Sequence, residues 1–280
     1  MPQKGRFIFD SRPGKEAELK RLTLLNEYYR PFMEKLFKSY EKNSREREKP
    51  FKKIIDIGAG TGYTTLLLKF FFPYADVTYF DSSLDLTEAA GREITKQGCT
   101  VNFLKGDLDS FDFSGTYDLV FSRFTLKHLY DPPAAIKKMT GILDPGGRIV
   151  LMDKDVTANI WYPAFPLYRT KYMQALNRYN RQTHRGGDSS VGRKIKYLLS
   201  KNNIVNITVE ALQTSLTGPE NTLYRQLYIG VYENLLPELV EAGFITEDDA
   251  HRDITALREF LEDTNNLAIT FDFIVSGIKE

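Results

Sequence analysis

Alternating glycines that follow an acidic residue are the feature of this chain most able to do chemistry. Residues 53–63 read Lys-Ile-Ile-Asp-Ile-Gly-Ala-Gly-Thr-Gly-Tyr. The isoleucines are typical of a strand buried on both faces, and residues 61–72 have the spacing of a helix that packs back onto a sheet. Glycine lets the backbone pass where a side chain would collide with a ligand. The segment therefore predicts a nucleotide-type cofactor site, formed by Asp56, Gly58, Ala59, Gly60, Thr61 and Gly62.

The spacing of these glycines distinguishes between two cofactors. The dinucleotide fingerprint requires a third glycine at the position that Tyr63 occupies here, which weakens an NAD interpretation. A cofactor without a pyrophosphate needs a less close approach by the helix N-terminus and more polar groups for an amino-acid tail. S-adenosylmethionine (SAM) is such a cofactor.

An acidic residue stands about 20 positions further along, at the end of a second predicted strand. This strand covers residues 75–80 and is followed by Asp81, where a doubly wound sheet places an acid on the ribose hydroxyls. The alternative is a helix cap, because Ser82 and Ser83 follow and a helix is predicted over residues 84–96. Because the glycine turn predicts the same ligand, we expect Asp81 and Ser82 to contact the cofactor.

Three more strands are predicted over residues 100–104, 117–121 and 148–152. Asp107 and Leu108 follow the third strand, where a carboxylate can accept the adenine amino group and the next residue can lie against the ring. Ser122 and Arg123 end the fourth strand and are expected at the same cofactor site. The regular order of strand, helix and strand predicts an α/β fold with a doubly wound, mostly parallel sheet.

Together these motifs resemble those of the class I SAM-dependent methyltransferases. The matching segments are Asp56-Ile-Gly-Ala-Gly-Thr-Gly62, Asp81, Gly106-Asp-Leu108, Tyr117-Asp-Leu-Val-Phe121 and Leu143-Asp-Pro-Gly-Gly-Arg148. Five motifs in the family's order are far more specific than one glycine motif. The resemblance implies a Rossmann-like, doubly wound, seven-stranded and mostly parallel sheet, with SAM as the cofactor.

The resemblance extends beyond this core to small-molecule methyltransferases of the quinone-biosynthesis and natural-product type. It is carried by residues 187–193, 198–199, 241–246 and 271–279. One departure is Asn202-Asn203-Ile204, which stands where the family usually carries Ala-Gly-Phe before the sixth strand. This departure concerns only where the preceding helix ends.

Composition favours a compact enzyme over several other classes. With 280 residues, 42% of them hydrophobic, the chain can bury a full core. Its 38 basic and 37 acidic residues nearly cancel, so it lacks the field that draws proteins to nucleic acid. A single cysteine, Cys99, rules out an intrachain disulfide and a cysteine-built zinc site, and no metal site is predicted. No apolar run suggests a signal peptide or a membrane span, so we expect a cytoplasmic protein.

The chain is expected to divide into an N-terminal helical arm, residues 1–48, and a SAM-binding domain, residues 49–280. Residues 15–40 place leucine and aromatic side chains near helical spacing. The charge run 41–49 is expected to be a solvated helix end or connection. Cap insertions are predicted over about 156–200 and 216–264. Helices are expected near 191–201, 219–241 and 246–263, and the last two strands near 204–211 and 268–278.

Segments that cover the strand ends are expected to choose the substrate. In open α/β sheets the ligand crevice lies outside the carboxyl ends of the strands, which places the arm and the insertion after the fifth strand over it. Arg21 and Tyr29 of the arm are predicted to contact SAM, with Arg21 at the methionine carboxylate. The alternative for these side chains is core packing or a solvated helix position. Contacts with the acceptor are predicted, against the same packing alternative, for Tyr28, Trp161, Tyr162 and Tyr168.

Catalysis by such a site depends mainly on aligning the acceptor atom with the methyl carbon of SAM. Methyl transfer from a sulfonium is an in-line displacement with a good leaving group, and a general base is required only if the acceptor atom must lose a proton. Asp155, just past the fifth strand, and His128 are the predicted candidates, with Asp153 and His184 considered beside them. The alternatives are a loop cap for Asp155, packing or capping for His128, and a solvated position for His184.

The sequence therefore predicts a SAM-dependent methyltransferase whose partner is a small, apolar or aromatic methyl acceptor. Whether oxygen, nitrogen or carbon is methylated stays open, as does assembly into a homo-oligomer. The first alternative is a protein of the same fold that binds SAM without transferring methyl, such as a pericyclic catalyst. The second is a nucleic-acid or protein methyltransferase, because Asp131-Pro132-Pro133 is similar to the amino-methylating signature. That signature belongs directly after strand four and requires an aromatic residue at the position of Ala134, so the second alternative is not adopted.

Overall fold

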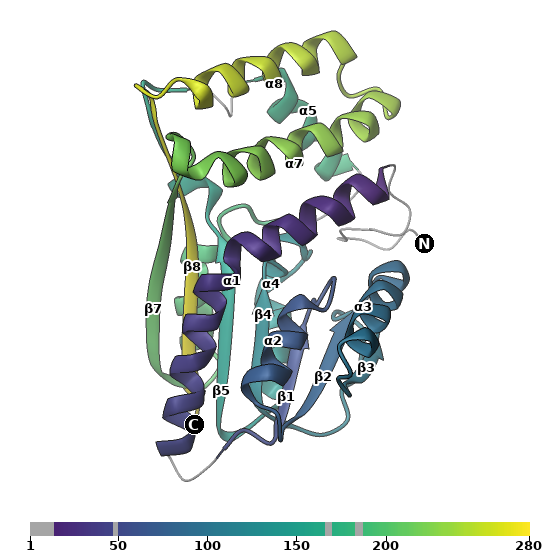
Figure 1. The fold of residues 1–280 in the computed structure, drawn as a ribbon, viewed down its shortest axis with the longest axis vertical. Coiled ribbons are helices and arrows are strands. Elements are labelled where there is room, and N and C mark those ends of the chain that lie inside the picture. The colour runs from purple at the N-terminus through teal and green to yellow at the C-terminus, as the bar shows by residue number, and fades with distance from the viewer. Residues whose placement is uncertain (1–13, 47–49, 166–169, 183–186) are drawn as a thin grey trace.

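A computed structural model describes residues 14–46, 50–165, 170–182 and 187–280 of the chain. At its centre lies a mixed β-sheet (Figure 1), and its first five strands are mutually parallel. They are β1 (Lys53–Ile57), β2 (Asp76–Asp81), β3 (Asn102–Lys105), β4 (Tyr117–Arg123) and β5 (Leu143–Lys154).

The antiparallel part of the sheet is organised around β8 (Leu267–Lys279). This strand pairs with β5, with β7 (Ile204–Ser215) and with β6 (Ile160–Tyr162). The seven predicted strands are β1 to β5, β7 and β8, and numbered among themselves they have the order 3-2-1-4-5-7-6. The predicted fold class is therefore confirmed, and β6 is a short strand that the sequence analysis did not separate from its insertion.

Burial on both faces explains the isoleucine-rich first strand. Ile54, Ile55 and Ile57 are all fully buried. Ile54 belongs to the core cluster beneath α1 (Lys15–Glu46) and α2 (Tyr63–Phe71), whereas Ile55 and Ile57 pack with residues of α4 (Pro132–Gly141) and α6 (Val191–Ser200). Because successive side chains of a strand point to opposite faces, helices cover both sides of the sheet.

Backbone conformation explains where several helices begin and end. Gly62 has a left-handed φ of 75°, so α2 begins at Tyr63 and not at the predicted Thr61. The helix α3 (Leu84–Lys96) begins as predicted, because the Ser83 hydroxyl accepts a hydrogen bond from the Leu86 N–H at 3.1 Å. After α6, Asn203 adopts a φ of 55°. Asparagine tolerates this conformation better than most residues, which accounts for Asn203 where glycine was expected.

The N-terminal helix α1 is longer than predicted and belongs to the main core. It continues to Glu46, into the charge run expected to be a solvated helix end or connection, because glutamate, lysine and arginine are good helix formers. Tyr29, Met33 and Phe37 are fully buried in the cluster that also contains residues of the sheet. One end of α1 lies beside α7 and the other lies along the sheet (Figure 1).

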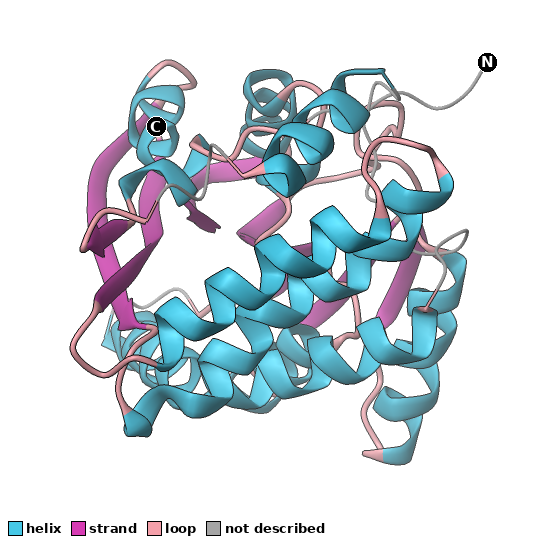
Figure 2. Ribbon diagram, turned by 90° about the horizontal axis from the view of Figure 1, so that it is seen from above, coloured by secondary structure: helices cyan, strands magenta, loops and turns pink. Residues whose placement is uncertain are grey.

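A layer of helices lies over the carboxyl ends of the parallel strands. It contains α5 (Lys171–Gln182), α7 (Thr222–Glu241) and α8 (Glu247–Glu262), at the top of Figure 1. Figure 2, seen from above, shows long helices crossing in front of the strand ends. The layer closes the end of the sheet where α/β folds bind their ligands. Among the helices of the described ranges, none has the length and apolar character that a bilayer span requires.

Candidate active site

The glycine turn between β1 and α2 is held against the end of β2. The backbone N–H groups of Gly58 and Ala59 donate to the Phe80 carbonyl oxygen at 2.8 and 3.1 Å. The Gly60 N–H donates to Oδ2 of Asp81 at 2.8 Å. These bonds place the turn and Asp81 side by side, as the motif spacing predicted.

The three glycines of the turn have different reasons to lack a side chain. A Cβ at Gly58 would lie 2.2 Å from Oγ1 of Thr125, and one at Gly62 would lie 2.8 Å from Cβ of Ala90. Packing within the protein and a positive φ therefore account for glycine at both of these positions. At Gly60, where φ is 56°, a Cβ would meet no described atom within 4 Å. Gly60 thus keeps the predicted role of leaving space for a cofactor.

Asp81 is half-buried at the carboxyl end of β2 and binds two backbone groups. Its Oδ1 accepts from the Ser83 N–H at 2.9 Å, while Oδ2 accepts from Gly60. The cap of α3 is Ser83, so the alternative that Asp81 is only that cap is wrong. Ser82 lies next to it and is also half-buried.

Asp107 is brought to the same edge by the end of β3. The Gly106 N–H donates to the Asp81 carbonyl oxygen at 3.0 Å, which joins the two strand ends. Oδ1 of Asp107 accepts from the Asp109 N–H at 3.1 Å, and the side chain is half-buried. Leu108 is buried in the core cluster on the α4 side of the sheet. Its predicted contact with an adenine ring stays a prediction.

Asp56 lies beneath the turn in a fully buried position. Its Oδ2 accepts a hydrogen bond from the Thr65 hydroxyl at 2.7 Å. Burial raises the pKa of Asp56 to about 7, while the bond from Thr65 and the charge of Arg123 oppose that rise. Asp56 therefore supports the turn from below, a role compatible with its place in the motif.

Arg123, at the end of β4, reaches the turn through a chain of side chains. Its Nη2 donates to Oδ1 of Asn26, and Nδ2 of Asn26 donates to Oγ1 of Thr61 at 2.9 Å. Its Nη1 is buried and has no hydrogen-bond partner among the described residues. The preceding Ser122 instead donates to the Ile57 carbonyl oxygen at 2.8 Å, which ties β4 to β1.

A buried polar network joins α1 and α7 to the sheet. Nζ of Lys154, at the end of β5, donates to Asp272 at 2.7 Å, to Tyr224 at 2.8 Å and to Tyr29 at 3.2 Å. The Tyr29 hydroxyl also donates to Asp272 at 2.5 Å. Burial alone would lower the pKa of Lys154, but Asp272 and the tyrosines raise it above its ordinary value. Tyr28 stacks on Tyr224, with ring centroids 4.4 Å apart.

Arg21 binds the side chain of Glu18, whereas the sequence predicted a contact with the methionine carboxylate of SAM. Its Nε and Nη2 each donate to the Glu18 carboxylate at 2.8 Å. Glu18 is buried and also accepts from Nδ2 of Asn234, on α7, at 2.9 Å. Arg21 therefore contributes to the contact between α1 and α7, and its role at a methionine carboxylate is not favoured by these bonds.

Phe124 is a feature of the site that sequence reasoning missed. It follows β4 with a φ of 58°, an uncommon and strained conformation for an aromatic residue. Its ring centroid lies 4.9 Å from Nζ of Lys154, 5.0 Å from Nζ of Lys127 and 5.5 Å from Cζ of Arg123. No sequence signal marks a phenylalanine for this conformation, so only the three-dimensional structure shows three cations around one ring.

The predicted acid–base candidates have structural partners. Asp155 caps the 3-10 turn Val156–Ala158 and binds the Arg193 guanidinium, and these hydrogen bonds lower its pKa against the effect of burial. This arrangement matches the loop-cap alternative. Asp153 is fully buried and accepts from two backbone N–H groups. His128 lies in the turn Leu126–His128, where its backbone N–H donates to the Thr125 carbonyl oxygen at 3.0 Å. His184 lies outside the described residues.

Comparison with known proteins decides the family. Residues 54–147 match a model of the methyltransferase domain. The trans-aconitate 2-methyltransferase of Deinococcus radiodurans is 35% identical over 37% of this chain and 38% of its own length. A demethylmenaquinone methyltransferase of Thermus thermophilus is 33% identical over 38% of this chain and 49% of its own. The chain therefore matches less than half the length of either curated relative.

Residues 54–147 form a class I SAM-dependent methyltransferase domain. The family and the cofactor predicted from the glycine turn, Asp81 and Asp107 are thereby confirmed. A solved structure of Haemonchus contortus phosphoethanolamine N-methyltransferase 2, in complex with phosphomonomethylethanolamine and S-adenosylhomocysteine, shares the fold. Its TM-score is 0.52 at 17% identity, over 86% of this chain and 52% of that one.

An aromatic cluster lies beside the methyltransferase domain, in the layer of helices. The ring of Trp161, on β6, lies 5.7 Å from Phe260, 5.8 Å from Phe165 and 6.3 Å from Tyr228. Its Nε1 is buried and has no partner among the described residues. Tyr162 is 71% exposed because adjacent strand residues face opposite ways, so a lining role beside Trp161 is not favoured. The predicted contact residue Tyr168 lies outside the described residues.

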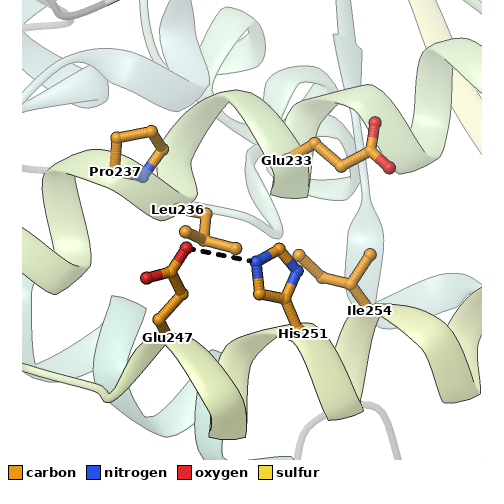
Figure 3. A pocket seen from close by; sticks show the side chains of 6 residues that line it. All are labelled: Glu233, Leu236, Pro237, Glu247, His251 and Ile254. Carbon is orange, nitrogen blue, oxygen red and sulfur yellow. Dashed lines mark ion pairs between the residues drawn. The ribbon is translucent and has the colours of Figure 1, made fainter.

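A pocket on the far side of α7 is separate from the methyltransferase site. It lies between α7 and α8 (Figure 3) and is lined by Glu233, Leu236, Pro237, Glu247, His251 and Ile254. The one ion pair drawn there joins Glu247 and His251 at 3.5 Å, with both side chains mostly exposed. Exposed pairs of this kind stabilise little. The pocket contains no residue of the strand ends or of the glycine turn.

Proposed function

We propose that the chain binds SAM at the glycine turn and transfers its methyl group to a small molecule. The observation that carries the proposal is the buried Nη1 of Arg123, which lacks a partner among the described residues. A guanidinium matches a carboxylate in charge and geometry, and the methionine part of SAM ends in one. We assign Arg123 to that carboxylate in place of Arg21, whose guanidinium already binds Glu18.

The rest of the cofactor would lie along the edge that joins the three strand ends. The space over Gly60 admits a ligand close to the backbone. Asp81 and Asp107 stand at adjoining strand ends and are both half-buried. In this proposal Asp81 accepts from the ribose hydroxyls, as the acid after the second strand does in other doubly wound folds. Asp107 accepts from the adenine amino group.

Rate enhancement in this proposal comes from alignment and exclusion of water. When bound, SAM supplies a methyl group on a sulfonium, which is transferred by in-line displacement. The chain's own contribution is to hold α1 and α7 over the strand ends, and the Lys154 network joins both helices to the sheet there. A proton acceptor is needed only if the methylated atom must lose a proton.

The aromatic cluster supports a small acceptor with an apolar or aromatic part. Trp161 and Tyr228 offer ring surfaces, and the Nε1 of Trp161 offers a donor that lacks a partner within the described residues. Trans-aconitate, demethylmenaquinone and phosphoethanolamine, the molecules in the names of related methyltransferases, are all small. These observations support a small-molecule acceptor and leave its identity to experiment.

Isothermal titration calorimetry with SAM and S-adenosylhomocysteine tests the cofactor part of the proposal. We expect micromolar dissociation constants, about −8 kcal/mol. Arg123→Gln should weaken SAM binding by about tenfold or more, because a charged hydrogen bond is worth about 1.5–3 kcal/mol. Arg92→Gln, at an exposed position of α3, is the matched control and should bind like wild type. Binding of NAD without binding of SAM would contradict the proposal.

Release of S-adenosylhomocysteine tests the transfer part. We expect release that depends on an added small-molecule acceptor and that is lower in Arg123→Gln than in wild type when SAM is below saturation. SAM binding without release, across a broad panel of acceptors, would favour the alternative in which the fold binds the cofactor and does not transfer its methyl group.

A further inference from the structure

Lys127 occupies a fixed position next to the proposed cofactor site. It lies in the 3-10 turn that follows β4. Its N–H donates to Oδ2 of Asp153 at 3.1 Å, and its carbonyl oxygen accepts from the Asp188 N–H at 3.2 Å. Its Nζ lies against the Phe124 ring that Arg123 contacts as well. The side chain therefore starts from a backbone held by hydrogen bonds and lies beside the Phe124 ring and the Arg123 guanidinium.

Two of the cations around Lys127 are already paired with carboxylates. Lys154 binds Asp272 at 2.7 Å, and Arg21 binds Glu18 at 2.8 Å. Asp153 accepts from the backbone N–H groups of Lys127 and Lys154, one on each carboxylate oxygen. Nζ of Lys127, in contrast, makes no hydrogen bond or ion pair with any described residue. The Lys127 ammonium thus has no direct anionic partner, although the Asp153 carboxylate stabilises its charge. The neighbouring Arg123 guanidinium likewise bonds to neutral Asn26 and not to a carboxylate.

An unpaired ammonium in this environment is unfavourable. Burial lowers the pKa of Lys127 to about 8, Asp153 on β5 and Asp272 on β8 act in the opposite direction, and Lys154 and Arg21 add to the lowering. An anion at Nζ would compensate for the lost hydration and for the two nearby cations. A neutral ligand would not.

We propose that Lys127 recognises an anionic group, a carboxylate or a phosphate, on the methyl acceptor. This inference rests on the proposed function and makes it more specific. The acceptor has an apolar or aromatic part that faces the aromatic cluster and an acidic oxygen that binds Nζ of Lys127. The Phe124 ring, held in its strained conformation, places this anion site beside the guanidinium assigned to the cofactor carboxylate.

Lysine-selective NMR of the whole chain tests the proposal directly. The chain is labelled with ¹³C at lysine Cε and saturated with S-adenosylhomocysteine, and the Lys127 signal is identified by its loss in Lys127→Gln. Inorganic phosphate and malonate are titrated separately at constant ionic strength, with chloride as the balancing anion. We expect at least one of them to shift the Lys127 signal saturably and to raise its pKa by about half a unit or more. The two anions distinguish a phosphate from a carboxylate acceptor.

Three variants make the result decisive. Lys127→Gln should weaken anion binding by about tenfold, as judged by anion-dependent thermal stabilisation, whereas Lys127→Arg should retain it. Lys96→Gln, at an exposed position of α3, should behave like wild type. An unmoved Lys127 signal in a protein that binds SAM normally would overturn the inference and leave the proposed function standing. Loss of SAM affinity in Lys127→Gln would assign the ammonium to the cofactor and overturn it as well.

Discussion

Gly60 is favoured over other residues for two separate reasons, its backbone conformation and the space that the proposed cofactor needs. Gly60→Ala should cost about 1–2 kcal/mol of stability, because its φ is 56°. It should also weaken SAM binding by about tenfold or more, because the new Cβ enters the space assigned to the cofactor. Gly146→Ala is a matched control, since Gly146 has a φ of 78° and likewise no described atom near its Cβ. Thermal denaturation and calorimetry check both effects; equal SAM affinity in the two variants would contradict the site.

Asp56 should make stability depend on pH. Burial raises its pKa to about 7 in the folded chain, far above the ordinary value near 4 that applies after unfolding. The unfolded chain therefore binds fewer protons between these values, and the free energy of unfolding falls as the pH rises through them. Relative to Asp56→Asn, wild type should lose up to a few kcal/mol between about pH 4 and pH 7 and change little above. Urea denaturation across this range checks it, and a constant difference would refute the assignment.

Local motifs made part of the site predictable at the residue scale. The glycine turn, Asp81 and Asp107 each follow a strand that can be recognised from its own residues, so their meeting at one edge follows from the parallel sheet. Phe124 and Lys127 could not be found in this way. A left-handed phenylalanine has no sequence signature, and an unpaired lysine becomes visible only when the partners of all its neighbours are known.

At the scale of elements, Lys154 joins β5, β8, α1 and α7. Lys154→Met should destabilise the chain by about 3–5 kcal/mol, because it leaves the Asp272 carboxylate buried without a cation. The double variant with Asp272→Leu should recover much of this loss. Lys171→Met, which removes an exposed ion pair with Asp249, should cost less than about 1 kcal/mol. Chemical denaturation measures the free energy of unfolding of all three variants. Equal losses of stability in Lys154→Met and Lys171→Met would show that burial does not increase the cost of breaking the ion pair.

Elements were predictable where their pattern is local and were missed where their partners are distant. The isoleucines of β1 and the Ser83 cap of α3 identify those elements within a few residues. The Lys154 network joins residues more than 100 positions apart, which no short window shows. The different exposure of Trp161 and Tyr162 could have been predicted, because successive side chains of a strand point to opposite faces. It was missed because residues 160–162 were not recognised as the strand β6.

At the scale of the whole molecule, cofactor and acceptor are proposed to contact different regions. Trp161→Ala should therefore reduce kcat/KM for the acceptor far more than it reduces SAM affinity. Tyr162→Ala, at the adjacent exposed position, should leave both unchanged. Steady-state kinetics with calorimetry compares the two variants. If Trp161→Ala changes only the melting temperature, the tryptophan is a packing residue.

The N-terminal helix is expected to be necessary for folding and not only for binding. Deleting residues 1–40 removes Tyr29, Met33 and Phe37 from the main core cluster. Burial of each such side chain is worth about 1.5–3 kcal/mol, so their sum approaches the whole stability of a typical domain. Circular dichroism should show no cooperative thermal transition for the truncated chain. A cooperative transition close to that of wild type would show that the helix is not required for folding.

The interior position of β8 has a consequence for synthesis on the ribosome. Residues 267–279 lie between β5 and β7 in the sheet, although they follow every other described strand along the chain. Until they emerge, β5 remains an unpaired edge and Lys154 has no carboxylate partner, while β1 to β5 can already associate. We therefore expect the nascent chain to pass through a state that exposes an apolar strand edge, and to depend most on chaperones just before residues 267–279 emerge.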